Sequence, residues 1–367
     1  MKVLAVTGAF LPDVGGMQYS THQTLLALTN QGVEVELICP KHSESADTDS
    51  EMPYRVMRVS QGSYIAALHR FFLIRKIWKK NNYDQLLLMG HFEEIIYGLA
   101  QFLYPTTPII LAAGTRLPFD GGKIKKWIRN LLLCNAYKKA HKIIAISPAT
   151  KQYIGLYCKK IRTPFFIIPR PIDGEVWKRK REKKGNDFTL VTFGRLEKAK
   201  NIQGVLQVVD NLRNKIPNIK YWIIGDGDYL DELKSIVTQL KLEDIAVFVG
   251  TISQSDVAKR IQDADICILL SKRYAGESFG RVYVEAAALG IPSIGYFSKG
   301  VTVAVNHGVT GFLCEVDDIA CVENSVWKLY NDTRLMDEMK ANATAHYQSK
   351  FTLEIVGKKF VEVLNHA

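Results

Sequence analysis

Residues 264–271 read ADICILLS, and residues 276–292 read GESFGRVYVEAAALGIP. The first stretch is a short apolar run of the kind that forms a buried parallel strand, and the second has the apolar spacing of a helix that begins near Gly280. Glu277 would then lie in the loop before the helix, and Glu285, eight residues later, on the flank of the helix. A strand, a loop and a helix in this order are the repeating unit of an α/β fold.

The same alternation of short apolar runs and helical patterns extends along the whole chain. We expect strands at residues 2–6, 33–39, 85–89, 108–113, 142–146 and 165–168, and again at 188–193, 221–224, 246–249, 266–270, 292–295 and 311–314. This pattern predicts an α/β protein with two Rossmann-like, doubly wound domains that face one another across a cleft. Ligands of such sheets collect at the carboxyl ends of the strands, so the cleft is the expected site.

A basic, polar stretch at residues 178–187 lies between the two series of strands and is typical of a linker edge. We expect an N-terminal domain at residues 1–172 and a C-terminal domain at 173–350. A helix at 351–367 is expected to pack back on the N-terminal domain.

The composition is that of a folded protein, with 367 residues of which 47% are hydrophobic and 23% charged. No apolar run approaches the ~18 residues of a membrane-spanning helix. We expect residues 1–6 to be a first strand rather than part of a signal peptide, because Asp13 and a glycine pair follow where a cleavage site would lie. The six cysteines include no Cys-x-x-Cys pair, so we expect reduced thiols in the cytoplasm and no disulfide scaffold.

The formal net charge of +11 is unevenly distributed. Residues 1–180 contain 25 Lys and Arg against 13 Asp and Glu, whereas residues 181–367 contain 23 against 24. Such an excess favours contact with something anionic, whether nucleic acid, a phospholipid surface or a phosphorylated substrate. No recognition motif for nucleic acid accompanies the charge, so we expect no nucleic-acid partner.

Two basic helical patterns, at residues 65–80 and 122–129, mix aromatic residues with cations. Helices of this kind can lie on an anionic membrane surface. For each helix the alternative is packing on the core with a solvated basic face. Together with the charge of the first half, the two patterns favour peripheral contact with the cytoplasmic face of a membrane. The candidate contacts at 122–129 are Lys123, Lys125, Lys126 and Arg129.

Two turns could bind an anionic ligand. Gly15 and Gly16 lie between the first strand and a helix, where bare backbone amides can approach a phosphate, although a tight turn is the alternative. Their spacing does not fit Gly-x-Gly-x-x-Gly, which disfavours a dinucleotide site. Arg195 and Lys200 bracket a turn after the strand at 188–193 and could hold a diphosphate from two sides. The alternative is a pair of solvated surface cations.

Carboxylates follow two later strands. Asp226 and Asp228 could hold Mg²⁺ or Mn²⁺, but a plain strand-to-helix turn explains Gly-Asp-Gly better. Glu277 and Glu285 could accept hydrogen bonds from vicinal hydroxyls, beside a helix N-terminus whose amides, from Ser278 to Val282, could bind phosphate. The alternative, a helix-dipole glutamate and a surface glutamate, explains the charges but not the rest of the pattern.

These motifs resemble those of the retaining glycosyltransferases of family 4, which have the GT-B fold. Glu277-x7-Glu285 is similar to the signature of that family. The accompanying motifs, in their usual order, are FGRL at 193–196, IGDG at 224–227 and NHGVTGFL at 306–313. The first half matches more loosely, through Gly15-Gly16 and residues 140–147, and the resemblance covers essentially the whole chain.

The resemblance implies that the N-terminal domain binds the acceptor and the C-terminal domain the nucleotide-sugar donor, and it implies a role for each motif. Arg195 and Lys200 would hold the donor diphosphate, Glu277 the hydroxyls of the transferred sugar, and Glu285 those of the ribose. Further donor contacts would come from Gly15, Gly16, Ile252, Ser278, Phe279, Gly280, Arg281 and Val282, with Ile252 by the base. Members of the family need no metal, so no metal or cofactor is expected.

The sequence departs from the family pattern on the sugar's side of the pocket. Many members carry a histidine where this chain has Gly114, Thr115 and Arg116. Arg116 or His91 could compensate, and for His91 a solvated loop position is the alternative. Residues 168–173, IPRPID, also replace the usual Pro-Asn-Gly-Val-Asp.

The resemblance therefore implies a retaining transfer of a hexose-type sugar from a nucleotide diphosphate sugar to a hydroxyl of a saccharide or lipid-linked acceptor, in polysaccharide or glycolipid synthesis. A UDP-sugar is the first expectation for the donor and GDP-mannose the second. The expected catalytic residues are Glu277, Arg195, Lys200 and His91. Two alternatives stay open: a sugar-nucleotide epimerase or hydrolase on the same fold, and a degenerate protein that binds a nucleotide sugar without turnover.

Overall fold

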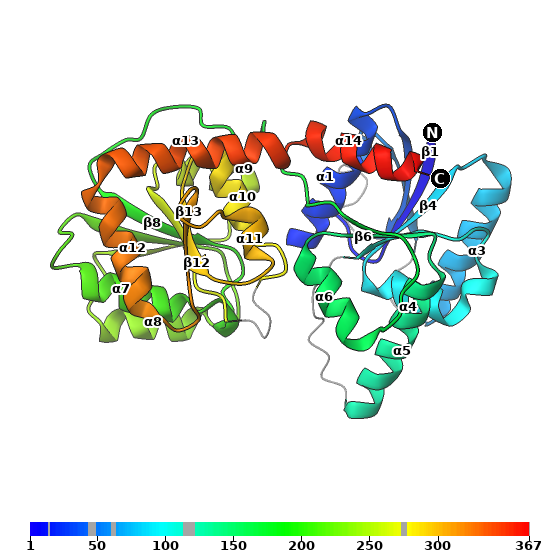
Figure 1. Ribbon diagram of the computed structural model, residues 1–367, viewed down its shortest axis with the longest axis horizontal. Coiled ribbons are helices and arrows are strands. Elements are labelled where there is room, and N and C mark those ends of the chain that lie inside the picture. Colours follow the sequence, from blue (N-terminus) through cyan, green and yellow to red (C-terminus); the bar gives the residue numbers. More distant parts are fainter. Residues whose placement is uncertain (14, 43–48, 60–63, 113–121, 273–276, 367) are drawn as a thin grey trace. The chain divides into compact units, whose positions relative to one another are not determined.

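The computed structural model describes residues 1–13, 15–42, 49–59, 64–112, 122–272 and 277–366, except for the side chains of 64–69. The chain divides into two compact units (Figure 1). Unit 1 comprises Met1–Pro171 and Leu353–Ala367, and unit 2 comprises Ile172–Thr352. The boundaries expected from the sequence lie within two residues of these positions.

Unit 1 is built on a seven-stranded parallel sheet with the strand order β3-β2-β1-β4-β5-β6-β7. The strands are β1 (Lys2–Thr7), β2 (Glu34–Pro40), β3 (Arg55–Val59), β4 (Gln85–Met89), β5 (Ile109–Ala112), β6 (Lys142–Ala145) and β7 (Phe165–Ile167). The helices are α1 (Gly16–Asn30), α3 (Tyr64–Lys80), α4 (His91–Ala100), η1 (Gln101–Leu103), α5 (Lys123–Lys139), α6 (Pro148–Tyr157) and α14 (Leu353–Asn365).

Successive side chains of a strand point to opposite faces of a sheet, so each strand of unit 1 contributes to two hydrophobic cores. On β1, Val3 and Ala5 pack with residues of α1 and α14, whereas Leu4 and Val6 pack with residues of α3, α4, α5 and α6. Strands buried on both faces are apolar throughout, which is why the sequence reveals them. The sequence missed β3, an edge strand that carries two arginines and in which every residue is at least partly exposed.

The C-terminal helix α14 belongs to unit 1. A Cβ atom on its Gly357 would stand 2.5 Å from the carbonyl oxygen of Ala27, so the helix lies directly on α1. At the other end of α14, the buried Lys142 of β6 donates from Nζ to the carbonyl oxygen of Val363 (2.9 Å). An ammonium group at the C-terminus of a helix satisfies carbonyl groups that have no partner within the helix.

Unit 2 has a six-stranded parallel sheet with the order β10-β9-β8-β11-β12-β13. The strands are β8 (Phe188–Phe193), β9 (Ile219–Ile224), β10 (Ala246–Gly250), β11 (Ile266–Leu269), β12 (Ser293–Tyr296) and β13 (Gly311–Cys314). The helices are η2 (Lys198–Lys200), α7 (Ile202–Leu212), α8 (Leu230–Gln239), α9 (Gln254–Ile261), α10 (Arg281–Ala288), α11 (Val301–Ala304), α12 (Ile319–Asn331) and α13 (Thr333–Lys350).

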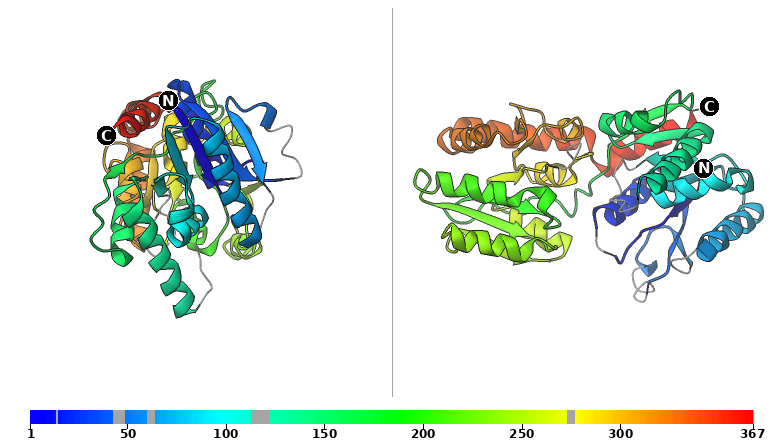
Figure 2. Two further views of the ribbon diagram at one scale, coloured as in Figure 1. Left: turned by 90° about the vertical axis from the view of Figure 1, so that its right-hand side faces the viewer. Right: turned by 90° about the horizontal axis from the view of Figure 1, so that it is seen from below.

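The two parallel sheets with their helices confirm the predicted α/β class and the two Rossmann-like domains (Figures 1 and 2). Within the described ranges, none of the helices combines the length and hydrophobicity that crossing a bilayer requires.

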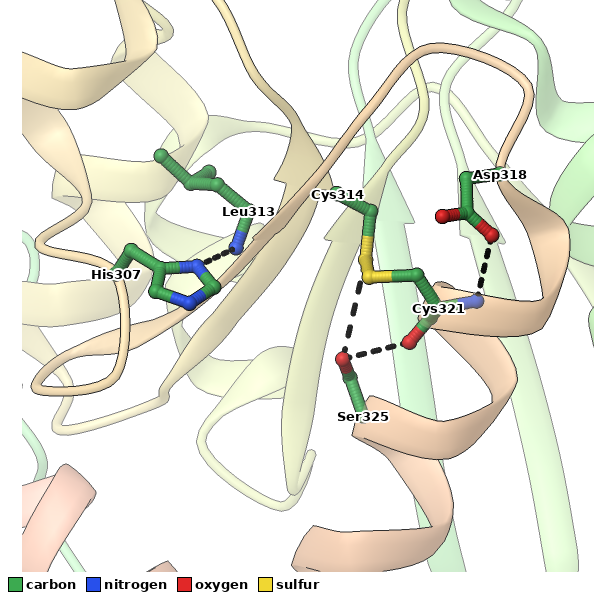
Figure 3. The surroundings of a disulfide bond; sticks show 6 residues. All are labelled: His307, Leu313, Cys314, Asp318, Cys321 and Ser325. Carbon is green, nitrogen blue, oxygen red and sulfur yellow. Dashed lines mark hydrogen bonds between the residues drawn. A yellow bond between two sulfur atoms is a disulfide. The ribbon is translucent and has the colours of Figure 1, made fainter.

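Four of the six cysteines form disulfide bonds, so the expectation of reduced thiols is wrong for these residues. Cys134 of α5 pairs with Cys158, 24 residues later, and Cys314 of β13 pairs with Cys321 in the first turn of α12. Figure 3 shows the second bond with the N-cap Asp318, whose carboxylate accepts from the amide of Cys321 (2.9 Å). The sequence spacing hides both pairs, because packing of α5 on α6 brings the first together and a short strand-to-helix loop the second.

Candidate active site

The candidate active site lies at the carboxyl edge of the unit 2 sheet, where the loops after β8, β9, β11 and β12 meet. Two of these loops are joined by their backbones. The amide of Lys272, after β11, donates to the carbonyl oxygen of Ala199, after β8 (2.8 Å), and the hydroxyl of Ser271 donates to the same oxygen (3.3 Å). This junction brings the turn that carries Lys200 beside Ser271 and Lys272, which follow β11.

Lys200 and Glu277 form an ion pair in which Nζ lies 2.5 Å from Oε1. The two side chains are only 18% and 13% exposed, so the contact is largely shielded from water. The η2 turn fixes the lysine, and Asn201 ends that turn in a left-handed conformation with φ of 52°. Cation and carboxylate, 77 residues apart in the chain, therefore meet at one edge of the unit 2 sheet.

The loop that carries Glu277 rests on the segment after β12. The hydroxyl of Ser298 donates to the carbonyl oxygen of Glu277 (3.2 Å), and a Cβ atom on Gly300 would stand 2.0 Å from that oxygen. Neither positioning residue, Ser298 or Gly300, could be recognised in the sequence. A glycine that is required for close approach of two backbones gives no signal in a single sequence.

The second carboxylate, Glu285, is inside the unit rather than on an open flank of α10. It is 4% exposed, and its Oε1 lies 2.6 Å from Nε of Arg281, one helical turn earlier. Burial raises the pKa of Glu285, and the neighbouring guanidinium lowers it. The helix thus holds a second shielded ion pair, whose arginine follows Glu277 by four residues.

The N-terminus of α10 begins at Gly280, whose φ of 77° is in the left-handed region that favours glycine. A Cβ atom here would also stand 2.5 Å from the ring of Tyr283. The first amides of a helix have no acceptor within the helix, so those of residues 279–282, together with the segment from Ser278, could receive an anion. Phe279 anchors this turn, with its ring 5.9 Å from that of Phe351.

Arg195 does not join the two ion pairs among the described residues. Its side chain is 70% exposed, and NH1 lies 3.4 Å from Oε1 of Glu197. Ile252, the residue expected by the base, lies partly buried in the loop after β10. Both residues are at the same edge of the sheet as Lys200, and their roles stay predictions.

Asp226 and Asp228 occupy a tight turn between β9 and α8. A Cβ atom on Gly225 would stand 1.9 Å from the carbonyl oxygen of Gly194, and one on Gly227 would stand 2.4 Å from that of Leu196. Asp226 accepts a hydrogen bond from the amide of Gly227 (2.7 Å). Close backbone packing accounts for the glycines here, which supports the turn interpretation over the metal one.

The candidates in unit 1 have mixed outcomes. Gly15 is the N-cap residue of α1 and Gly16 its first residue; Gly15 has a φ of 179°, an extended conformation that any residue can adopt. His91 is the first residue of α4 and is 6% exposed, so its interpretation as a solvated loop histidine is wrong. Its Nδ1 lies 3.2 Å from Oε2 of Glu94. Gly114, Thr115 and Arg116 lie outside the described residues.

A buried charged cluster around His91 was not anticipated. Glu94 is fully buried and accepts from the hydroxyl of Tyr137 (2.7 Å), while the carboxylate of Glu93, 2% exposed, lies 3.5 Å from Nε of Arg70. Burial raises the pKa of Glu93, and Arg70 lowers it. The only sign in the sequence is a pair of adjacent glutamates in an otherwise apolar helix.

The basic positions of α5 divide into two groups. Lys123, Lys125 and Lys126 are exposed, as a surface role requires. Arg129 is 8% exposed and donates to the side-chain oxygen of Asn130 (3.0 Å from NH2), so its expected contact with lipid is wrong. At 100° per residue, position 129 falls on the face that packs against unit 1.

The sequence matches two families of protein along consecutive segments. The family described as Glycosyltransferase Family 4 matches residues 14–176, and the family described as Glycosyl transferases group 1 matches residues 173–346. The two segments together span nearly the whole chain, with the ion-paired residues inside the second. The protein belongs to the group 1, family 4 glycosyltransferases of the GT-B fold.

Individual relatives are distant. The chain is 31% identical to N-acetyl-alpha-D-glucosaminyl L-malate synthase of Bacillus anthracis over 171 residues, which cover 47% of this chain and 43% of that protein. It is 23% identical to alpha-monoglucosyldiacylglycerol synthase of Streptococcus pneumoniae, over 85% of this chain and 75% of that one. The crystal structure of HepE from Anabaena in complex with UDP has a TM-score of 0.82 at 18% identity and covers 99% of both chains, which shows the shared fold.

Proposed function

We propose that this glycosyltransferase moves a hexose-type sugar, with retention of configuration, from a nucleotide diphosphate sugar to a hydroxyl of a saccharide or lipid-linked acceptor in polysaccharide or glycolipid synthesis. The observation that carries the proposal is the shielded Lys200–Glu277 ion pair at the carboxyl edge of unit 2. The cation can bind the diphosphate that leaves such a donor with negative charge. The carboxylate can accept hydrogen bonds from the hydroxyls of its sugar.

Without a donor, Lys200 and Glu277 neutralise one another. In the donor complex, the ammonium of Lys200 would bind a diphosphate oxygen, and the carboxylate of Glu277 would accept hydrogen bonds from sugar hydroxyls. Amides at the N-terminus of α10 would stabilise the charge that develops on the β-phosphate as the sugar departs. The exposed Arg195, which pairs with Glu197 at 3.4 Å, could exchange that partner for the same diphosphate, which makes it a supporting cation rather than a fixed one.

Glu285 is our candidate for the ribose hydroxyls. Arg281 occupies its Oε1, so Oε2 is the oxygen we assign to the ribose. Gly15 and Gly16 of unit 1 are candidates for the diphosphate, and His91 is the candidate for the acceptor. We propose departure and attack on the same face of the sugar, with the leaving phosphate taking the proton of the acceptor hydroxyl.

A UDP-sugar is the first candidate for the donor and GDP-mannose the second. The likeness to HepE, solved with UDP, supports the first choice. The family relationship to a synthase of glucosyl diacylglycerol supports a lipid-linked acceptor and a place for the enzyme at the cytoplasmic face of an anionic membrane. Lys200 and the helix N-terminus would neutralise the leaving diphosphate, so we propose that transfer needs no metal.

A panel of nucleotide sugars, scored by thermal shift and by donor consumption, tests the proposal. A donor present at about 100 times its Kd should stabilise the native protein by about 2.7 kcal/mol. The Lys200→Ala variant should lose the shift, whereas Lys198→Ala, which removes an exposed lysine from the same turn, should keep it. Consumption of donor that does not depend on any acceptor would favour a hydrolase or epimerase. A shift with no consumption under any acceptor would favour a degenerate binding protein.

A further inference from the structure

We infer that the N-terminal half of α5 docks on an anionic lipid surface through an exposed apolar stripe between lysines. The stripe consists of Ile124, Trp127, Ile128 and Leu131, whose residues are 74%, 65%, 45% and 54% exposed. Steps of three and four residues place them on one face of the helix. A helix that only covers a protein core carries polar residues on its outer face, so this stripe needs a partner.

The stripe lies opposite the face that packs on unit 1. The buried residues of α5 are Arg129, Leu133, Ala136 and Tyr137. At 100° per residue they lie about 180° away from the stripe around the helix axis. The exposed apolar side chains therefore do not belong to the face with which the helix packs on the core. They form a second apolar face of α5.

The charges beside the stripe identify the partner as anionic. Lys123, Lys125 and Lys126 are exposed, and α5 contains no acidic residue. Unit 1 as a whole has 24 Lys and Arg against 13 Asp and Glu. Apolar side chains with a tryptophan, flanked by lysines, match the boundary between acyl chains and anionic headgroups. A second copy of the chain fits less well, because a symmetric contact would bring the lysine clusters together.

The position of α5 makes the stripe accessible within unit 1. Two perpendicular views show the N-terminal end of the helix projecting away from the body of the unit (Figures 1 and 2). Helix α4 runs antiparallel beside it, since Glu94 contacts Tyr137 and the carbonyl of Gly98 accepts from Asn135 (2.6 Å). Continued at the same register, this pairing brings the exposed Leu99 and Phe102 level with Leu131 and Ile128.

This inference deepens the proposed function, on which it rests for its setting: a surface that binds lipid would hold unit 1 at the membrane where a lipid-linked acceptor resides. The binding of lipid needs neither donor nor turnover. The two proposals can therefore fail separately.

Sedimentation of the purified full chain with vesicles tests the inference. We expect binding to vesicles that contain phosphatidylglycerol and much weaker binding to pure phosphatidylcholine. Each lysine near an anionic surface strengthens binding about fivefold, so Lys125→Glu should weaken it by at least that factor. Trp127→Ser and Leu131→Ser should each weaken it roughly tenfold, because each removes several buried carbons from the acyl region.

Matched controls come from other exposed positions. Leu156→Ser on α6, where the leucine is 68% exposed, and Lys234→Glu on α8 should bind like the unsubstituted protein. Thermal midpoints of all variants show whether they fold. Unchanged binding in Trp127→Ser and Leu131→Ser would overturn the inference, as would equal binding to both vesicle types. So would a dimer that these variants convert to monomer without any vesicle binding. Vesicle binding by a protein that binds none of the nucleotide sugars in the panel would overturn only the proposed function.

Discussion

The two units of the chain arrange their first six strands in the same order but differ in net charge. In each, the first strand is flanked by the next two strands on one side and by the fourth strand on the other, the order typical of a doubly wound fold: β3-β2-β1-β4 in unit 1 and β10-β9-β8-β11 in unit 2. Unit 1 carries 24 basic against 13 acidic residues, and unit 2 carries 24 of each. The fold is thus compatible with either net charge. The net charge of a unit therefore indicates the kind of partner that it binds and not its fold.

The carboxyl edges of the two sheets also differ. Unit 2 holds two close ion pairs, Lys200–Glu277 and Arg281–Glu285, with N–O distances of 2.5 and 2.6 Å. In unit 1 the Arg58–Asp49 pair beside β3 is equally close, at 2.6 Å, whereas the pair between Arg70 and Glu93, which lies on the helix after β4, is buried more deeply and is looser, at 3.5 Å. In an ion pair that is close and partly accessible, a charged ligand can replace one of the two partners. The proposed donor complex requires such a replacement. The loops, rather than the sheet, distinguish the two edges.

The largest effect that we expect concerns the accessible pair. Lys200→Ala and Glu277→Ala should each lower kcat/KM for transfer by about a hundredfold to a thousandfold, because each removes a group that stabilises the departing diphosphate or positions the sugar. Steady-state kinetics with the donor found in the panel measures the loss. Lys198→Ala is the matched control for the lysine, and circular dichroism shows whether the fold is kept. Turnover within a few-fold of the unsubstituted enzyme in either variant would contradict the proposed site.

The next effect compares the buried pairs of the two units. Arg281→Ala leaves the carboxylate of Glu285 buried without its cation, which should lower the free energy of unfolding by about 3–5 kcal/mol. Arg70→Ala should cost less, since Glu93 already lacks a close hydrogen bond from Arg70. Denaturant unfolding of both variants measures the difference. Equal losses of unfolding free energy would contradict this expectation, because the longer Arg70–Glu93 pair would then stabilise the protein as much as the Arg281–Glu285 pair does.

The pH dependence of the Arg281→Ala variant follows from the raised pKa of Glu285. A folded-state pKa above the unfolded value of 4.5 means that the folded protein binds the proton more tightly. Stability from this group is therefore complete below pH 4.5 and declines as the pH rises through the folded-state pKa. Removing Arg281 raises that pKa further, so the deficit of the variant should shrink on acidification. The double variant Arg281→Ala, Glu285→Gln should lack this pH dependence.

Much of the fold could be predicted because strands buried on both faces are apolar runs, and the motif at 276–292 contains both carboxylates of the candidate site. Other features depend on packing that one sequence does not reveal. The edge strand β3 is too exposed to form such a run. Arg129 belongs to a basic helix whose buried face could not be chosen from composition, so a buried cation was mistaken for a surface one. Gly300 is required because a Cβ atom at this position would stand 2.0 Å from the carbonyl oxygen of Glu277.

A smaller effect separates the two disulfide bonds. Cross-links stabilise more when they close longer loops, in the chain-entropy model by about 3.5 kcal/mol for a loop of 24 residues and about 2.5 kcal/mol for one of seven. Cys158→Ser in unit 1 should therefore destabilise by about 1 kcal/mol more than Cys321→Ser in unit 2. Peptide mapping without reductant first establishes both bonds. Recovery of all four cysteines as free thiols would contradict the pairing.

The smallest effect concerns Asp228. If the Gly-Asp-Gly turn after β9 only provides close backbone packing, the carboxylate of Asp228 has no part in transfer, and Asp228→Asn should change kcat/KM by less than about threefold. A metal clamp would instead make the carboxylate essential, because Mg²⁺ and Mn²⁺ depend on charged oxygen ligands. Addition of a chelator separates the two readings of the turn without any substitution. A large loss of kcat/KM in Asp228→Asn, partly reversed by added Mn²⁺, would assign neutralisation of the diphosphate to a bound ion instead of Lys200. The two sheet edges would then differ in metal binding rather than in ion pairs.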